Sequence, residues 1–280
     1  MRVLVSADME GVSGVVHPDD VEPGTVSYAE FRHVMTSDVN AAIAGLFDAG
    51  ASQVVVNDAH YTMRNLVVTD LDPRVTYIRG SQKPLGMIEG LLDDRGQPAV
   101  DAVAFVGYHA GAGQPGVLAH CHLGNSITGV RFGGAVMSEG RMNAAVAAEF
   151  GVPLVLVTGD DITCADARAY APGVSTAQVK RAITRYTAHL ESLSVAQARI
   201  RAAAAAGLAA RPAPATVLPP FEIEVDFDAA HLADAAVRLP GVRRSSHLQV
   251  VATGTTMLEA YQIFRLVALI AATATVNDWG

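Results

Sequence analysis

The segment Arg2-Val-Leu-Val-Ser-Ala-Asp-Met-Glu-Gly11 joins a short apolar run directly to two carboxylates. A run of this length followed by glycine predicts a buried β-strand over residues 2–7. Asp8 and Glu10 lie at its end, at positions i and i+2, which point to the same side of an extended chain. Two carboxylates that close repel each other unless a cation lies between them. The segment therefore predicts a strand that delivers acidic ligands to a divalent metal.

Two later apolar runs end in the same manner. Residues 52–57 are a predicted strand that is followed closely by His60, and residues 102–108 are another that is followed by His109. Carboxylates and imidazoles from three strand ends form the mixed oxygen and nitrogen set that zinc accepts, and manganese suits the same set. Each histidine alone is more often structural than functional. Their joint occurrence at successive strand ends is what favours a metal site.

Strands and helices alternate through the first half of the chain. Predicted helices cover residues 28–49 and 142–150, and residues 154–158 form a further apolar strand. Continuous apolar strands separated by helices are typical of a parallel sheet that is covered on both faces. We therefore expect an α/β fold with a mainly parallel sheet between helices, followed by a smaller α+β part. Such sheets bind ligands beyond the carboxyl ends of their strands.

The second half of the chain has a different composition. Residues 176–189 and 194–210 are predicted helices, whereas the proline-rich residues 211–220 cannot be helical. We place a domain boundary there, which gives an α/β metal-site domain over residues 1–210 and a smaller α+β domain over residues 211–280. Within the second domain we expect an alternating strand just after the prolines and a long helix at the end.

Composition limits the classes of partner. The chain has 280 residues, is 50% hydrophobic and carries a formal net charge of −8, which allows a full core and argues against nucleic acid as a partner. Two cysteines imply no disulfide framework, and the start lacks a signal-peptide pattern, so we expect a cytoplasmic protein. The apolar residues 267–276 are too few to span a bilayer. We interpret them as a buried helix or one at a subunit contact, with no membrane partner.

A glycine-rich segment follows the third strand. Residues 111–116 have the glycine spacing of a dinucleotide fingerprint, but Pro115 interrupts it and no helix follows to bind a pyrophosphate. We interpret this segment as a wall of the site. His120, Cys121 and His122 come next, and the two histidines would share one face of an extended segment. A metal cluster, a catalytic histidine and a solvent-facing polar strand all remain open.

Glu139 stands between a predicted hairpin and a predicted helix. Glycines near residue 133 mark the turn of the hairpin, which we place over residues 126–138. A carboxylate at the start of a helix is stabilised by the helix dipole, so a structural role explains Glu139 by itself as well as a metal-binding role does.

An ordered set of short motifs resembles the M55 family of zinc D-aminopeptidases. The resemblance extends to residue 261 and so covers nearly the whole chain. The motifs are Ala7-Asp-Met-Glu-Gly-Val-Ser-Gly14, Val56-Asn-Asp-Ala-His60, Val106-Gly-Tyr-His-Ala110, Pro115-Gly-Val-Leu-Ala-His120, Glu139-Gly-Arg-Met-Asn143 and Thr158-Gly-Asp-Asp161.

This resemblance implies a set of site residues and an assembly. It implies two zinc ions per chain and a homo-oligomer, a decamer of stacked pentamers. It also implies His120 as the catalytic histidine. The metal ligands that it implies are Asp8, Glu10, His60, His109 and Glu139.

The expected activity is hydrolysis of the N-terminal amide bond of short peptides, with D-amino-acid peptides such as D-Ala-D-Ala as the implied substrates. A hydroxide held between two metals would attack the amide carbonyl. His120 would stabilise the oxyanion or protonate the leaving amine. Two alternatives stay open, namely another metal-dependent amide or phosphate-ester hydrolase, and a peptide-binding protein with a structural metal.

Overall fold

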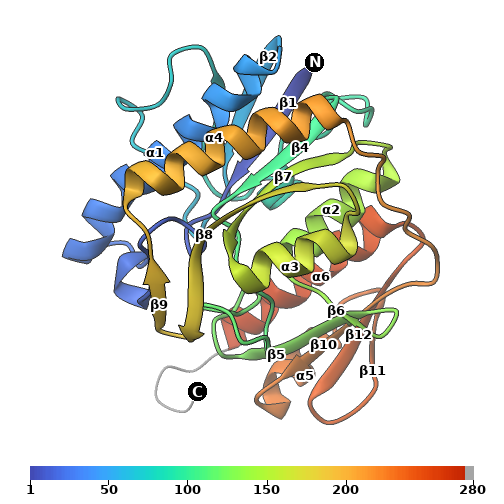
Figure 1. The fold of residues 1–280 in the computed structure, drawn as a ribbon. Helices are drawn as coiled ribbons and strands as arrows, with labels where there is room; N and C mark the ends of the chain where they lie inside the picture. Colours follow the sequence, from blue (N-terminus) through green and yellow to red (C-terminus); the bar gives the residue numbers. More distant parts are fainter. Residues whose placement is uncertain (275–280) are drawn as a thin grey trace.

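A seven-stranded sheet forms the centre of the computed structural model, which describes residues 1–274 (Figure 1). Its order is β3-β2-β1-β4-β7-β8-β9, and every neighbouring pair is parallel except β8 and β9. The strands are β1 (Arg2–Ala7), β2 (Gln53–Asp58), β3 (Thr76–Ile78), β4 (Ala102–Val106), β7 (Leu154–Asp160), β8 (Ser175–Thr184) and β9 (Thr187–Leu190). The predicted α/β fold with a mainly parallel sheet is confirmed.

The strand order reverses its direction between β1 and β4. From β1 the chain adds β2 and β3 on one side, and from β4 it adds β7 and β8 on the other. Main-chain hydrogen bonds continue past the ends of these strands, from the Asp8 amide to the Val106 carbonyl and from the Gly11 amide to the Gly107 carbonyl, both at 2.8 Å. A side chain at Gly11 would overlap the carbonyl of Tyr108, so the two turns can approach this closely only with glycine there. Open α/β sheets bind ligands at such a switch point.

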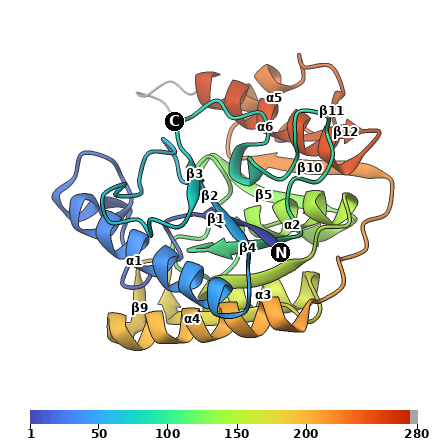
Figure 2. The same ribbon diagram turned by 90° about the horizontal axis from the view of Figure 1, so that it is seen from above.

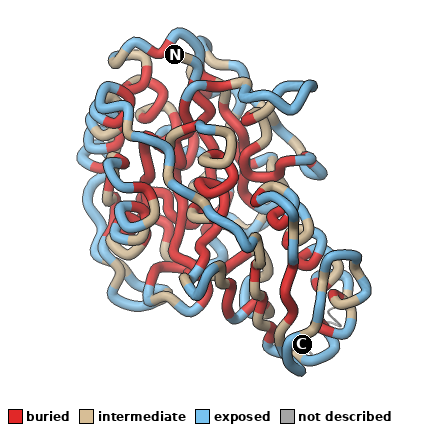
Figure 3. The backbone as a smooth tube through the Cα atoms, turned by 90° about the vertical axis from the view of Figure 1, so that its right-hand side faces the viewer, coloured by how far each residue is buried: buried red, intermediate tan, exposed pale blue. Residues whose placement is uncertain are grey.

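Two helices cover one face of this sheet. They are α1 (Val26–Asp48) and α4 (Leu193–Ala210), which lie against each other below the sheet in Figure 2. Apolar residues of β1 and α1, including Val3, Val5 and Ile43, share one buried cluster. Figure 3 shows buried residues running along the strands between these layers.

A second, antiparallel sheet and further helices cover the opposite face (Figure 2). The sheet has the order β11-β12-β10-β5-β6, with strands β5 (Ile127–Phe132), β6 (Ala135–Val136), β10 (Phe221–Phe227), β11 (Val242–Arg244) and β12 (Gln249–Gly254). The helices of this half are α2 (Glu139–Glu149), α3 (Asp161–Tyr170), α5 (Ala230–Ala236) and α6 (Met257–Ala274). This sheet combines two strands from before residue 210 with three from after it. The domain boundary at that residue stays a prediction.

The helix predicted over residues 176–189 is wrong. This segment forms β8 and β9, which meet in an antiparallel hairpin at the edge of the sheet. Ala177 and Val179 are buried at alternate positions, and β-branched residues such as Thr176 and Ile183 are common in the segment. Alternating burial and β-branched residues favour a strand. Pairing with β7 outweighs the helix propensity of the other residues in this segment.

The final helix α6 is long and apolar enough to cross a bilayer by length and composition, as the core helix of a soluble fold also can be. Its inner side is buried, with Met257, Tyr261 and Phe264 in the same apolar cluster as α2 and the second sheet. This agrees with the prediction of a buried helix. Residues 275 and 276 of the predicted apolar run lie outside the described residues.

Replacing Gly45 by alanine should test how closely α1 and α4 pack. Alanine normally stabilises a helix interior by about 1 kcal/mol relative to glycine. A Cβ at this position would lie 2.1 Å from the carbonyl oxygen of Arg201 in α4. We therefore expect Gly45→Ala to lower the free energy of unfolding by about 1–3 kcal/mol. In the control, exposed Ser37→Ala of the same helix, the change should stay within about 0.5 kcal/mol. Urea denaturation measures both, and a stabilised Gly45→Ala would contradict the packing.

Candidate metal centre

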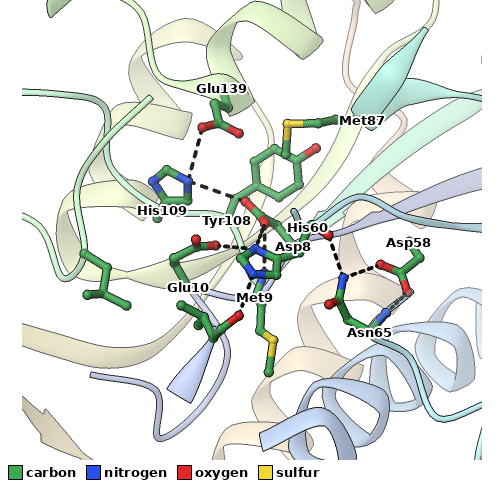
Figure 4. A network of polar contacts seen from close by, with 12 residues as sticks. Asp8, Met9, Glu10, Asp58, His60, Asn65, Met87, Tyr108, His109 and Glu139 are labelled. Atoms are coloured by element: carbon green, nitrogen blue, oxygen red, sulfur yellow. Dashed lines mark hydrogen bonds and ion pairs between the residues drawn. The ribbon is translucent and has the colours of Figure 1, made fainter. Parts of the chain in front are cut away.

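The structure brings all six predicted site residues together at the switch point, and Figure 4 shows five of them, all but His120. Strand β1 ends at Ala7, so Asp8 and Glu10 stand in the turn after it rather than on the strand itself. The histidines follow β2, β4 and the glycine-rich segment. Glu139 is the first residue of α2. The residues brought together are Asp8, Glu10, His60, His109, His120 and Glu139, and all but His120 are buried.

Asp8 occupies the centre of this cluster. One of its oxygens, Oδ1, lies 3.2 Å from Nδ1 of His60, and the other, Oδ2, lies 3.5 Å from Nε2 of His109. The Glu10 carboxylate approaches the same His60 nitrogen at 3.1 Å, and the Glu139 carboxylate approaches the same His109 nitrogen at 3.6 Å. Among the described residues, Glu10, His109 and His120 form one set of three possible ligand atoms within 4.8 Å of one another, Cys121, His122 and Glu139 form another, and two further sets share Asp8. The two that share Asp8 are Asp8, Glu10 and His60, and Asp8, His109 and Glu139.

Main-chain carbonyls orient all three histidines. Nε2 of His60 lies 3.0 Å from the Val21 oxygen, Nδ1 of His109 lies 2.9 Å from the Ala110 oxygen, and Nδ1 of His120 lies 2.9 Å from the Leu118 oxygen. Because a carbonyl only accepts, each of these nitrogens donates its hydrogen there. In a neutral ring the opposite nitrogen then presents a lone pair to the carboxylates. Histidine ligands of metals are oriented in this way.

The charges of the cluster do not balance by themselves. Asp8 Oδ2 and Glu10 Oε2 are buried and accept no hydrogen bond from the described residues. Burial and the neighbouring Glu10 charge raise the pKa of Asp8 to about 7. Burial lowers the pKa of His109, but the carboxylates, Glu139 first, outweigh it and raise that pKa to about 10. Without a metal, the negative charge of the carboxylates is compensated only by protons on Asp8 and the histidines. A bound cation would compensate the same charge, so the residues present fit a metal ion.

His120 lies at the outer side of the cluster. Its ring stacks on that of His109, with centroids 4.2 Å apart. Its Nε2 is 3.8 Å from the Glu10 carboxylate and 4.0 Å from that of Glu139, which is farther than the other two histidines are from their carboxylates. The side chain is 17% exposed, against 1% for His109. His120 therefore faces the solvent side of the site.

Cys121 and His122 have different surroundings. The segment is not an extended strand, because His122 has a φ of 56°, so the predicted sharing of a face does not apply. The Cys121 thiol packs in the apolar core, where burial raises its pKa well above the usual value. The His122 amide donates to Glu139 at 2.8 Å, and its Nδ1 lies 3.6 Å from the same oxygen. His122 thus helps to position Glu139, while Cys121 is a core residue.

Lys180 is a supporting residue that the sequence analysis did not identify. It is buried on β8, and its ammonium donates to the carbonyls of Glu10, Val12 and Val15 at 2.6, 3.0 and 2.7 Å. These three bonds hold the turn that carries Glu10. A single lysine in a segment of alternating apolar residues could have indicated a buried, hydrogen-bonded ammonium. The incorrect prediction of a helix meant that this alternation was not used.

Two aspartates hold the other loops. Asp160 caps α3 through the Thr163 amide and also accepts from the Val117 amide at 2.8 Å, which fixes the segment leading to His120. Asp58 accepts from the amide and the side chain of Asn65, and Asn65 Nδ2 donates to the His60 carbonyl at 2.6 Å (Figure 4). The loops that carry Glu10, His60 and His120 are therefore each hydrogen-bonded to a buried charge.

A cavity of about 420 Å³ opens above the cluster. The six site residues form its floor, and Tyr61, Met63, Met87 and Leu123 contribute to its walls. Polar ligand atoms at the base and apolar side chains above them are the usual construction of a small-molecule site.

A buried oxygen and nitrogen ligand cluster below an open cavity, at the carboxyl edge of a parallel sheet, defines the class of a metal-dependent hydrolase. The family model of D-aminopeptidases, Peptidase M55, matches residues 1–266. The chain therefore belongs to the M55 peptidase family, and the predicted enzyme class, a metal-dependent peptidase, is confirmed.

Two relatives from Bacillus subtilis are similar along almost the whole chain. A D-aminopeptidase of strain 168 is 36% identical over 277 residues, which is 94% of each chain. The solved structure of the Zn-dependent D-aminopeptidase DppA, described as a self-compartmentalizing protease, superposes with a TM-score of 0.90 at 32% identity. That match covers 97% of this chain and 98% of the other.

Metal removal should make stability depend on pH. In the metal-free fold the pKa values of Asp8 and His109, about 7 and about 10, exceed the values of about 3.9 and about 6.5 in an unfolded chain. These two groups bind more protons in the folded state, so their contribution to the free energy of unfolding falls as pH rises between these limits. Metal takes the place of those protons and should reduce the fall.

Urea midpoints of chelator-treated and zinc-reloaded protein at about pH 6 and about pH 8 measure this. A metal-free protein that is more stable at the higher pH would contradict the charge balance described here.

Proposed function

We propose that this protein is a dinuclear zinc aminopeptidase that removes the N-terminal residue of short peptides, with D-amino-acid peptides such as D-Ala-D-Ala as substrates. The central observation is that Asp8 belongs to two sets of ligand atoms. The zinc dependence and the preference for D-residues are supported by the similarity to a D-aminopeptidase and to a Zn-dependent D-aminopeptidase of Bacillus subtilis.

Each zinc ion would be held by one of the two sets. Asp8, Glu10 and His60 would hold one ion, and Asp8, His109 and Glu139 the other, with Asp8 shared. Bound zinc would supply an activated water as nucleophile and polarise the amide carbonyl. Zinc suits the mixed donor set, in which each histidine presents a free nitrogen to the site.

His120 is proposed as the residue that handles the proton. Its Nδ1 hydrogen is engaged by the Leu118 carbonyl, so Nε2 is the atom that can take up a proton and deliver it to the leaving amine. Burial, and after it the neighbouring His109 charge, lower the pKa of His120 in the metal-free fold. Its place at the solvent side of the cluster leaves room for a substrate above it.

The phosphate-ester alternative is less well supported by the geometry. It needs basic groups that bind a phosphate at the metal centre itself, and none of the described residues that line the cavity over that centre is a lysine or an arginine. Lys180 uses its three donors on carbonyls of the Glu10 turn, and Arg131 pairs with Asp226 on the second sheet. Arg141 donates to the Val136 carbonyl. The peptide-binding alternative has the same arrangement of residues, so a measurement of turnover is needed to distinguish it from the peptidase.

We also propose a homo-oligomer, in the form of a decamer of stacked pentamers, in the cytoplasm. The self-compartmentalizing relative supports assembly. Leu266 and Leu269 are 50% and 63% exposed on α6 and are available for a subunit contact. Cys121 and Cys164 are both unpaired, which suits a reducing compartment.

Two substitutions should separate proton handling from metal binding. His120→Asn should keep both zinc ions and lose about a hundredfold or more in kcat, because only proton transfer is removed. Glu139→Ala should lose zinc and activity together, because a ligand is removed. Metal analysis and kinetics on the same preparations measure this. Loss of zinc from His120→Asn would show that His120 is a metal ligand instead. A full zinc content in Glu139→Ala would exclude Glu139 as a metal ligand.

Paired D-Ala and L-Ala p-nitroanilides test the activity itself. We expect faster cleavage of the D isomer, about two zinc ions per chain and loss of cleavage with a chelator. Bound metal without cleavage of either isomer, of dipeptides or of a phosphate ester would favour the peptide-binding alternative. Cleavage of the phosphate ester alone would overturn the peptidase proposal.

A further inference from the structure

Arg185 is half-buried in the turn between β8 and β9, where its guanidinium carbon lies 5.8 Å from the ring centroid of Tyr186. Its carbonyl accepts a hydrogen bond from the Leu118 amide at 2.9 Å, which places the turn beside the segment that carries His120. Its Nε is buried and has no hydrogen-bond partner among the described residues. No carboxylate of the described residues forms an ion pair with it. A buried donor without a partner is costly, so a ligand that accepts from it is expected.

This side chain lines a second cavity of about 260 Å³. The cavity shares Glu10, Val21, His120 and Gly124 with the larger cavity over the metal centre. The two spaces therefore adjoin at His120. Of the described residues that line the second cavity, Arg185 is the one with a permanent positive charge.

The order of groups in a peptide matches this order of cavities. In the proposed reaction the free amine and the first carbonyl lie at the metal centre, and the leaving amine lies at His120. The residue released after His120 continues into the adjoining cavity, and in a short peptide it ends in a carboxylate. A guanidinium is the side chain best suited to bind a carboxylate, because its planar donors match the two oxygens.

We propose that Arg185 binds the C-terminal carboxylate of the substrate, so that this site selects short peptides with a free C-terminus. This inference rests on the proposed function. It makes Arg185 a specificity-determining residue, and it predicts that a neutral C-terminal amide is a poorer substrate than the free acid.

The test compares D-Ala-D-Ala with its C-terminal amide in the zinc-loaded protein. Wild type should prefer the acid. Arg185→Ala should reduce that preference about ten- to a hundredfold, mainly through KM, and should leave cleavage of the amide within about threefold. Arg185→Lys should keep part of the preference, because the charge remains while the fork of donors is lost. The control is Arg181→Ala, an exposed arginine of β8 outside this cavity, which should change neither substrate.

Two results would overturn the inference. One is an equal effect of Arg185→Ala on acid and amide, and the other is a wild type without preference. Failure of the proposed function looks different, because wild type would then cleave neither peptide. In that case calorimetric titration of the zinc-loaded protein with the same two peptides distinguishes the two failures, since binding needs no turnover. Stronger binding of the acid that Arg185→Ala abolishes would support the carboxylate site, and equal binding would exclude it.

Discussion

The structure depends on the neutralisation of three carboxylates buried at one point of the fold. Asp8, Glu10 and Glu139 meet where the strand order reverses, and oxygens of the first two have no hydrogen-bond donor among the described residues. Burying unpaired charge is among the largest costs that a fold can carry. The three histidines reduce this cost only if they are protonated, yet each is oriented to offer a lone pair. The local structure is therefore built for a cation.

The surrounding loops are held by charges of their own. Lys180 fixes the Glu10 turn, Asp160 fixes the approach to His120, and Asp58 fixes the loop behind His60. Because rigid supports keep ligand atoms in place, the site needs little rearrangement when metal binds.

The sequence predicted the parts of the fold that local pattern controls. Continuous apolar runs predicted β1, β2, β4 and β7, and the polar residues after the first three predicted four of the five candidate ligands, whereas Glu139 was added only by the family resemblance. Pairing between strands that are distant in the sequence could not be predicted from these local patterns. Residues 175–184 form a strand because they pair with β7. In the second sheet, β5 pairs with β10, which lies roughly ninety residues later in the chain. Lys180 and Arg185 lie on the misread β8–β9 hairpin, which is why their positions became apparent only in three dimensions.

That hairpin divides its tasks by position. Lys180 lies within the paired part of β8, where the neighbouring strand fixes it, whereas Arg185 lies in the turn, where insertions and deletions are tolerated most easily. A change in the length of the turn would move the guanidinium without disturbing the ammonium that supports the Glu10 turn. Within this fold, descendants could diverge in the length of peptide they accept while keeping the turn that carries Glu10 in place.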